Sequence, residues 1–297
     1  MDIDDLQTFV AVADAGGVSA AARRLGVSKS IVSRRLFRIE AELGAQLVAR
    51  TTRGAALTEA GMIFRDHAAR VSAEIDTARE SIQPDGELRG RLRVALPFTF
   101  GPTHFAPVVA EMARRHPQLH IHAAYQDRLV DLIAEGYDCA IRVGSLHDSS
   151  LIAQRVAPIR GALVASPDYV ETHGAPVTPE EVTEHEALMQ GTETWQFMDA
   201  GSVINVQPRG RFKADNAKAL AVAAAAGLGI AWLPNCVTQE YVIAGALVPI
   251  MTEYPPPDAG IYVVRPPGRH PARKIRVLTE MLGEDIKSNP NLWGLDR

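Results

Sequence analysis

One face of a short segment near the N-terminus carries groups that could recognise DNA bases. Ser30, Ser33, Arg34 and Phe37 are spaced i, i+3, i+4 and i+7, which places them on one side of a helix. A guanidinium can fork onto guanine O6 and N7, hydroxyls pair with several base edges, and an apolar group can contact the thymine methyl. An ordinary solvated helix face would have a similar pattern. The spacing alone therefore favours a base-contacting face and a solvated face about equally.

The opposite side of the same segment is apolar and should pack inward. It carries Val32, Leu36, Ile39 and Leu43, spaced i, i+4, i+7 and i+11. An Ala-rich segment precedes it, with Ser19 placed to cap its start and Gly26 to end it. Ser28 is placed to cap the second segment. Two helices joined by a tight turn with glycine form a helix-turn-helix.

The charge distribution favours the DNA interpretation. Eight lysine and arginine residues lie between Arg23 and Arg53, against only Glu40 and Glu42, which gives this segment a net charge of +6. The whole chain carries −4, so the remainder is about −10. A basic segment in an acidic molecule is typical of a surface that binds phosphate.

The next stretch predicts a short β-wing. The helical pattern breaks at Gly44 and again at Gly54, with two arginines and two threonines between them. Such a hairpin could reach the phosphate backbone or minor groove, although a plain polar turn would have the same composition. The candidate DNA-contacting residues are Ser28, Lys29, Ser30, Ser33, Arg34, Phe37, Arg38, Arg50, Thr51 and Arg53.

Composition sets the outer limits. At 297 residues the chain is long for one core, so we expect two or more domains. The chain begins with acidic residues and has no long apolar run, so we expect no signal peptide and no membrane span. Cys139 and Cys236 are the only cysteines, and we expect buried, unreactive thiols and a cytoplasmic protein.

A long helix should follow the wing, capped by Thr58 and running to about residue 83. It carries an a/d heptad seam of Phe64, Ala68, Val71, Ile75, Ala78 and Ile82. The seam could pack on its own domain or on a second copy, and its length favours the second copy. The helix should stop at the Pro84-Asp85-Gly86 turn, which begins a hinge to about Gly90.

From residue 91 the pattern alternates between strands and helices, which predicts sheets with helices on their faces. The expected strands are 92–96, 119–124, 137–143, 161–165, about 203–206, 229–232 and 260–264. The expected helices are 4–14 near the N-terminus and then 105–115, 129–135, 216–226, about 234–244 and 273–284. The tail from Lys287 should be loosely ordered because Asn289-Pro290-Asn291 favours neither element.

The chain resembles the LysR-type transcriptional regulators. In residues 1–62 the resemblance is carried by Leu6-Gln7-Thr8-Phe9, Ser19-Ala20-Ala21-Ala22, Leu25-Gly26-Val27-Ser28, Val32-Ser33, Ile39-Glu40-Ala41-Glu42-Leu43-Gly44, Arg50-Thr51-Thr52-Arg53 and Leu57-Thr58-Glu59-Ala60-Gly61. Further on it is carried by residues 127–138, 141–144, 165–169, 226–231 and 245–248. One departure is Val48 after Leu47, where the family usually has Leu-Phe.

The resemblance implies an α/β fold class with an N-terminal all-α winged helix-turn-helix and a C-terminal two-lobed, periplasmic-binding-protein-like α/β domain. The implied DNA-binding domain is 1–62, with a linker or dimerisation helix and hinge over 63–90. The effector-binding domain would cover 91–287, with lobe I at 91–160 and 267–287 and lobe II at 161–266.

Effector candidates follow from the rule that ligands of open α/β sheets bind beyond the carboxyl ends of strands. They are Phe98, Thr99, Phe100, Gln126, Asp127, Gly144, Ser145, Asn216 and Trp232. Hydroxyls of Thr99 and Ser145 could orient a polar or carboxylate effector. For each position, local capping or core packing is an equally good explanation.

The leading hypothesis is a sequence-specific transcriptional regulator whose effector alters promoter binding. Its partners would be double-stranded DNA with a dyad-symmetric operator, a small-molecule effector, and a homodimer or homotetramer partner, with RNA polymerase as a further candidate and no membrane. Two alternatives are a DNA-binding protein whose α/β part only oligomerises, and a binding-protein-fold enzyme with a DNA-binding domain. We expect no enzymatic activity, no cofactor and no metal. The sequence contains no nucleophile elbow, no phosphate-binding loop and no cluster with the spacing of metal ligands.

Overall fold

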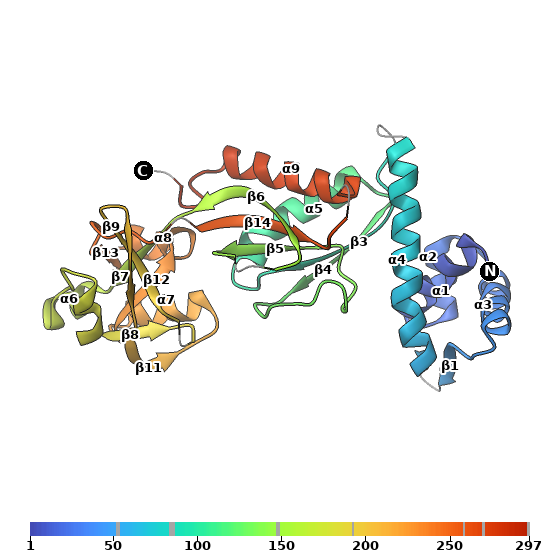
Figure 1. Cartoon of the computed structure of the whole chain (residues 1–297), viewed down its shortest axis with the longest axis horizontal. Coiled ribbons are helices and arrows are strands. Elements are labelled where there is room, and N and C mark those ends of the chain that lie inside the picture. Colours follow the sequence, from blue (N-terminus) through green and yellow to red (C-terminus); the bar gives the residue numbers. More distant parts are fainter. Residues whose placement is uncertain are drawn as a thin grey trace. The chain divides into compact units, whose positions relative to one another are not determined.

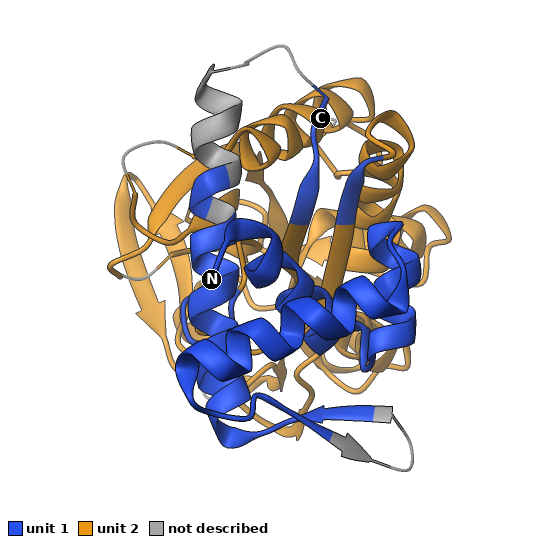
Figure 2. Cartoon of the chain, turned by 90° about the vertical axis from the view of Figure 1, so that its right-hand side faces the viewer, with its two compact units in different colours: residues 1–91, 118–120, 133–136 blue, residues 92–117, 121–132, 137–297 orange. Residues whose placement is uncertain are grey.

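The computed structural model describes residues 1–51, 54–82, 87–146, 149–191, 193–257, 259–268 and 271–295. The chain divides into two compact units, drawn in blue and orange in Figure 2. The N-terminal unit comprises residues 1–91, 118–120 and 133–136. The C-terminal unit comprises residues 92–117, 121–132 and 137–297.

The N-terminal unit contains the expected helix-turn-helix and wing. Its elements are α1 (Ile3–Ala15), α2 (Val18–Leu25), α3 (Lys29–Leu43), the strands β1 (Val48–Thr51) and β2 (Gly54–Leu57), and α4 (Glu59–Ile82). Figure 1 labels the four helices and β1. The two strands pair antiparallel. Fully buried Phe9, Val32 and Ile39 lie in one core, and the rings of Phe9 and Phe64 are 5.2 Å apart. The three helices and the first turns of α4 therefore share a single apolar centre.

Most of the predicted caps are confirmed. Ser28 Oγ accepts a hydrogen bond from the Ile31 amide at 3.3 Å, and Thr58 Oγ1 accepts one from the Gly61 amide at 3.0 Å. Gly26 ends α2 at a φ of 65°, in the left-handed region that glycine tolerates. The prediction for Ser19 was wrong: α2 begins at Val18 after Gly17, with no side-chain cap.

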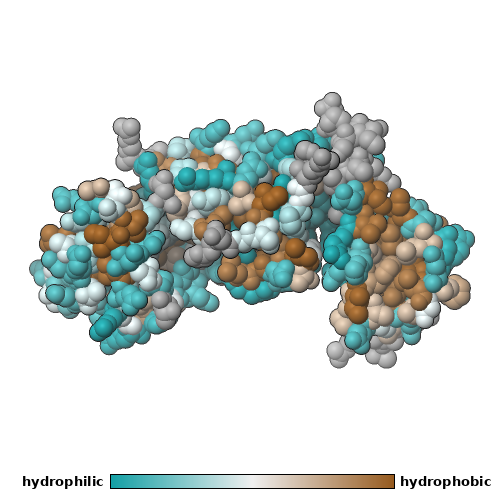
Figure 3. All heavy atoms as spheres, in the orientation of Figure 1, coloured by the Kyte–Doolittle hydropathy of each residue, from teal (hydrophilic) through white to brown (hydrophobic). Residues whose placement is uncertain are grey.

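The predicted heptad seam of α4 divides between two environments. Ala68 is 1% exposed and Phe64 packs against the unit's own core, so this part of the seam is used within the chain. Val71 is exposed, as are Met62 and Ile63. Figure 3 shows apolar residues on the visible face of this unit, over α4 and the helices beside it. Ile75 is half-buried, and the side chains of Ala78 and Ile82 lie outside the described residues.

The inward stripe of α3 is shorter than predicted. Val32, Leu36 and Ile39 are buried as expected, but Leu43 is 41% exposed. Gly44 follows it directly and ends the helix, so Leu43 belongs to a last turn that the core does not cover.

The C-terminal part forms two five-stranded sheets, one in each lobe. The lobe I sheet has the order β4 (Leu119–Tyr125), β3 (Gly90–Leu96), β5 (Cys139–Gly144), β14 (Ala259–Arg265) and β6 (Ile152–Ile159). The lobe II sheet has the order β11 (Arg209–Lys213), β8 (Glu186–Met189), β12 (Ile230–Pro234), β7 (Gly161–Ala165) and β13 (Val248–Ile250). A separate hairpin joins β9 (Trp195–Asp199) and β10 (Ser202–Val206).

Helices accompany both sheets. Lobe I has the π-helical turn η1 (Gly101–Phe105), α5 (Ala106–Arg115) and α9 (Arg273–Ser288), and α5 lies alongside α9 (Figure 1). Lobe II has α6 (Pro167–His173), the 3-10 turn η2 (Glu180–Glu184), α7 (Ala217–Ala225) and α8 (Asn235–Ile243). The predicted alternation of strands and helices is thus confirmed for most segments.

Two details of the predicted α/β region were wrong. The lobe boundary at 266 assigned β14 to lobe II, but β14 pairs with both β5 and β6 and so completes the lobe I sheet. The predicted helix 129–135 is a turn, in which Leu132 O accepts from the Tyr137 amide at 2.8 Å. Val130 and Leu132 are both buried, and a helix would point residues two apart to opposite sides.

The C-terminal tail is packed rather than loose. Trp293 is 1% exposed, its ring lies 5.3 Å from that of Phe105, and its Nε1–H donates to Asp285 Oδ2 at 3.2 Å. His104 Nε2 lies 3.1 Å from the carbonyl oxygen of Leu292, in hydrogen-bond contact. The Asn-Pro-Asn pattern did not predict this packing, because it reports only weak local preferences for helix or strand. Burial of the Trp293 indole outweighs those preferences.

We expect Trp293→Ala to destabilise the C-terminal part by about 3–5 kcal/mol, because removing a buried ring leaves a cavity against η1. Thermal unfolding followed by circular dichroism would measure the loss. Leu292→Ala is the matched control, since that side chain is 39% exposed. Equal melting temperatures for the two variants would contradict the role given to the tail.

Candidate DNA-binding surface and ligand cleft

The residues expected to contact DNA from α3 share one exposed surface. This surface comprises Ser28, Lys29, Ser30, Ser33, Arg34, Phe37 and Arg38, all of them exposed. Phe37 is 72% exposed, which is unusual for an aromatic ring on a packed helix. The buried stripe on the other side holds this surface outward.

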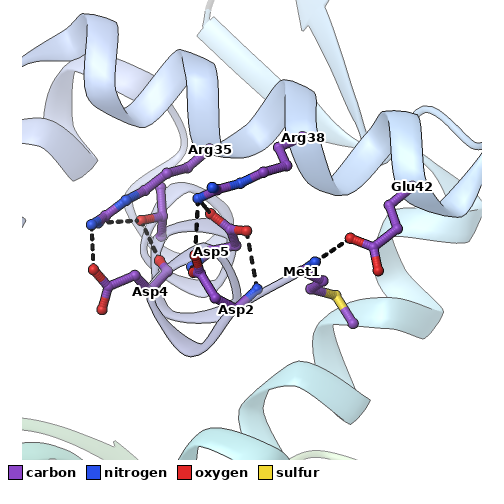
Figure 4. Close-up of polar contacts among 8 residues, drawn as sticks. Met1, Asp2, Asp4, Asp5, Arg35, Arg38 and Glu42 are labelled. Atoms are coloured by element: carbon purple, nitrogen blue, oxygen red, sulfur yellow. Dashed lines mark hydrogen bonds and ion pairs between the residues drawn. The ribbon is translucent and has the colours of Figure 1, made fainter.

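The acidic start of α1 holds two of the arginines of α3 (Figure 4). Arg38 forms ion pairs with Asp5 and, at 3.1 Å, with Asp2. Arg35 pairs with Asp4 and donates to Thr8 Oγ1 at 3.2 Å. These contacts fasten α3 to α1, so Arg38 has partners within the chain as well as exposure to solvent.

The pairing is also visible in the pKa of Asp5. The side chain of Asp5 is fully buried, and burial by itself would raise its pKa. Hydrogen bonds from Arg38 and from the Asp2 amide outweigh this effect and leave the pKa lowered. The carboxylate is therefore ionised at neutral pH and holds the guanidinium.

This arrangement changes the charge estimate made from residues 23–53 alone. Over residues 1–62, Asp2, the three aspartates of α1 and Glu59 raise the count to seven acids against eight cations. Among the described residues, Lys29 and Arg34 form no ion pair. They are the cations of α3 that remain available to an external anion.

The wing has the expected hairpin geometry, with Arg50 opposite Ala55 and Thr51 opposite Gly54. The predicted contact Arg53 lies outside the described residues. Arg50 and Thr51 lie in β1, but their side chains are outside what the structure describes.

Asp14 is the second ionic centre of the N-terminal unit. Its carboxylate, 13% exposed, pairs with Arg65 of α4 at 3.0 Å, with Arg91 of β3, and with Arg24 of α2 at 3.9 Å. Burial would raise the pKa of Asp14, but the charges of Arg91 and Arg65 and their hydrogen bonds lower it. One carboxylate thus joins α1 to three other elements.

The C-terminal unit contains a cleft of about 920 Å³. It is lined by these residues from the sequence prediction: Thr99, Phe100, Gln126, Asp127, Gly144, Ser145 and Trp232. Phe98 and Asn216 do not line it. Phe98 is exposed, and Asn216 caps α7 by accepting from the Lys218 and Ala219 amides at 3.0 and 3.2 Å. For Asn216 the local capping explanation accounts for the side chain.

Thr99 lies at the cleft but its hydroxyl is already engaged. The residue is 5% exposed, and its amide and Oγ1 donate to the two carboxylate oxygens of Asp127 at 3.3 and 3.2 Å. Thr99 therefore positions the Asp127 carboxylate beside the cleft.

Sequence reasoning missed several lining residues. They include Leu129, Arg142, Leu146, Arg160, Glu193 and Trp195. Arg142 lies within β5 instead of after its end, so the strand-end rule passed over it. A charged residue inside the apolar run Cys139-Ala140-Ile141-Arg142-Val143 was a signal that could have found it.

The cysteines are free and shielded. Burial raises the pKa of the Cys139 thiol and raises that of Cys236 to about 12, so both are protonated at neutral pH. In the part of the chain that the structure describes, no three His, Cys, Asp or Glu side chains are placed to hold a metal. No described helix is long and apolar enough to span a membrane.

Two family models match the chain. Residues 3–62 match the "Bacterial regulatory helix-turn-helix protein, lysR family", and residues 85–287 match the "LysR substrate binding domain". The chain belongs to the LysR family of transcriptional regulators. The predicted family, the fold class and the regulatory function are confirmed, and the members of this family are DNA-binding, oligomer-forming regulators rather than enzymes.

Individual relatives agree with this assignment. A Haemophilus influenzae protein described as an uncharacterized HTH-type transcriptional regulator is 33% identical and covers 90% of this chain and 95% of its own length. The HTH-type transcriptional regulator PtxR of Pseudomonas aeruginosa is 32% identical, with 98% of this chain and 95% of its own length covered. The structure of CrgA from Neisseria meningitidis, a LysR-type transcriptional regulator, is 27% identical with a TM-score of 0.56, covering 96% of this chain and 99% of CrgA.

We expect Asp14→Asn to cost about 1.5–3 kcal/mol of stability at pH 7, the typical worth of hydrogen bonds to a charged group. Because the folded pKa of Asp14 is lowered, its stabilisation is present above the ordinary value of 3.8 and is lost as pH falls through the folded pKa. Denaturant unfolding at pH 7 and near pH 3 would measure the difference from the unaltered chain.

Asp66→Asn is the control, since Asp66 forms no ion pair among the described residues of α4. A difference for Asp14→Asn that does not shrink on acidification would show that packing, and not charge, supplies the stability.

Proposed function

We propose that this regulator recognises a dyad-symmetric operator with the exposed surface of α3, and that a small-molecule effector in the cleft of the C-terminal unit changes how it binds promoters. The observation that carries the proposal is which cations of α3 have carboxylate partners and which do not. Arg35 and Arg38 are held by α1, whereas Lys29 and Arg34 have no carboxylate partner among the described residues.

The chemistry of this surface fits a major groove. Arg34 can form two parallel hydrogen bonds to guanine, and the exposed ring of Phe37, one turn further along α3, can contact a thymine methyl. Lys29 at the first turn and the hydroxyls of Ser30 and Ser33 suit phosphates and base edges. The wing would add contacts to the backbone beside the groove.

A second copy supplies the symmetry. Met62, Ile63 and Val71 leave apolar surface exposed on α4, which a partner helix could cover. A homodimer, or a tetramer built from dimers, would present two copies of α3 to half-sites one or more helical turns apart. Such a protein would act in the cytoplasm, and RNA polymerase is the partner through which promoter binding would affect transcription.

The cleft suits a regulatory ligand. Its volume of about 920 Å³ lies within the range of small-molecule sites, and residues of both sheets line it. A ligand that binds better when the two walls approach would shift the protein toward that conformation and so couple to the operator.

Capture of sheared genomic DNA from the source organism, followed by sequencing, tests the operator part. We expect discrete peaks that share a dyad motif. Arg34→Ala should weaken binding to that motif about 5–150-fold, since a bidentate base contact contributes about 1–3 kcal/mol. Phe37→Ala should relax the preference at one thymine position.

Arg276→Ala is the matched control, because it removes an exposed arginine from α9 in the C-terminal unit. Uniform, salt-sensitive capture without peaks would mean only phosphate attraction and would overturn the operator role.

A further inference from the structure

We propose that the cleft binds a monocarboxylate with an apolar body, and that the Arg142 guanidinium holds the carboxylate. This inference rests on the proposed role of the cleft as the effector site and adds the chemical class of the ligand.

The first argument is the state of the charged groups that line the cleft. They are Asp127, Glu193, Arg142 and Arg160. Both carboxylates are occupied locally: Asp127 accepts from the amide and hydroxyl of Thr99, and Glu193 accepts from the Gln190 and Gly191 amides at 2.7 and 2.6 Å. The acidic groups are therefore committed to shaping the walls and are poor sites for a cationic ligand.

Arg142 is in the opposite situation. It is half-buried on β5, and among the described residues its side chain forms one hydrogen bond, from Nη1 to the carbonyl oxygen of Arg128 at 3.3 Å. No described carboxylate pairs with it. Burial lowers the pKa of Arg142, although a guanidinium stays charged at neutral pH. A half-buried charge with unused N–H groups is stabilised by an anion, and a carboxylate matches its fork geometry.

The second argument is the apolar surface beside this charge. Leu129 is 80% exposed and Leu146 is 41% exposed, yet both line the cleft, and the ring of Trp232 is half-buried in the lobe II wall. Exposed leucines in a concave site lose contact with water when an apolar group covers them. The ligand should therefore carry an aryl or branched alkyl group next to its anionic end.

A single negative charge fits better than a dianion. Arg160 is exposed, so water already solvates its charge, and the two wall carboxylates oppose a second negative charge in the same space. Inorganic phosphate or a phosphate ester would need more cationic donors than the cleft provides.

Isothermal titration calorimetry on the full chain tests the class with matched probes. The acids are phenylacetate and 4-methylpentanoate, their uncharged controls are phenylacetamide and 4-methylpentanamide, and inorganic phosphate and glucose test the other classes. We expect at least one acid to bind and its own amide to bind at least tenfold more weakly. Arg142→Gln should raise the Kd of that acid at least tenfold, and Arg142→Lys should recover part of the loss.

Arg114→Gln, an exposed arginine of α5, should leave the Kd within twofold. The proposal is overturned if neither acid binds, if acid and amide bind alike, if phosphate or glucose binds more tightly, or if Arg142→Gln leaves the Kd unchanged. Operator capture by the unaltered chain separates this result from the proposed function: if that chain gives discrete peaks but binds neither acid, the ligand class is wrong and the DNA-binding role stands.

Discussion

The orientation of α3 depends on its attachment to α1. Asp5 is fully buried, carries a charge, and contacts Arg38, while Asp4 contacts Arg35. Because Asp5 is buried and Arg38 is half-exposed, removing Arg38 would leave a buried charge without its cationic partner, which makes this contact costly to rearrange. Together with the buried stripe of Val32, Leu36 and Ile39, it fixes which side of α3 faces outward. The position of Arg34 and Phe37 follows from that constraint.

The same contact explains what the sequence could and could not predict in the N-terminal unit. Helices, the glycine at the turn, the Ser28 cap and the wing depend on residues close in the chain, and their patterns were sufficient. The partner of Arg38 lies 33 residues away, and a charge count over residues 23–53 could not include it. The charge count therefore treated all these cations as available to DNA. In the fold, Arg35 and Arg38 pair with residues of α1, and Lys29 and Arg34 stay on the exposed surface of α3. The Ser19 cap failed differently, since α2 starts one residue before it and needs no side chain there.

In the C-terminal unit the strand-end rule located the cleft and Asp127, but it missed the two arginines that line it. Thr99, Gln126 and Ser145 follow strands and line the cleft, because sheet topology brings the ends of strands together. Arg142 interrupts β5, and whether a strand residue points into a cleft depends on register and on the opposite wall. Glu193 lies just before β9 and Trp195 is the first residue of that strand, and no local pattern gave either residue a position. Likewise, the burial of Trp293 depends on His104 and Phe105, almost 190 residues earlier.

A common rule connects the two candidate surfaces. Charges that find partners inside the chain, such as Arg38 with Asp5 or Asp127 with Thr99, hold elements in place and are poorly suited to bind a ligand. Lys29 and Arg34 on α3 and Arg142 in the cleft lack a carboxylate partner among the described residues, and each lies where an external anion can approach. On α3 the setting is convex and solvated, which suits phosphates and base edges bound with strong salt dependence. In the cleft the setting is concave and lined with leucines, where a single carboxylate gains more from the same guanidinium because less water competes for it.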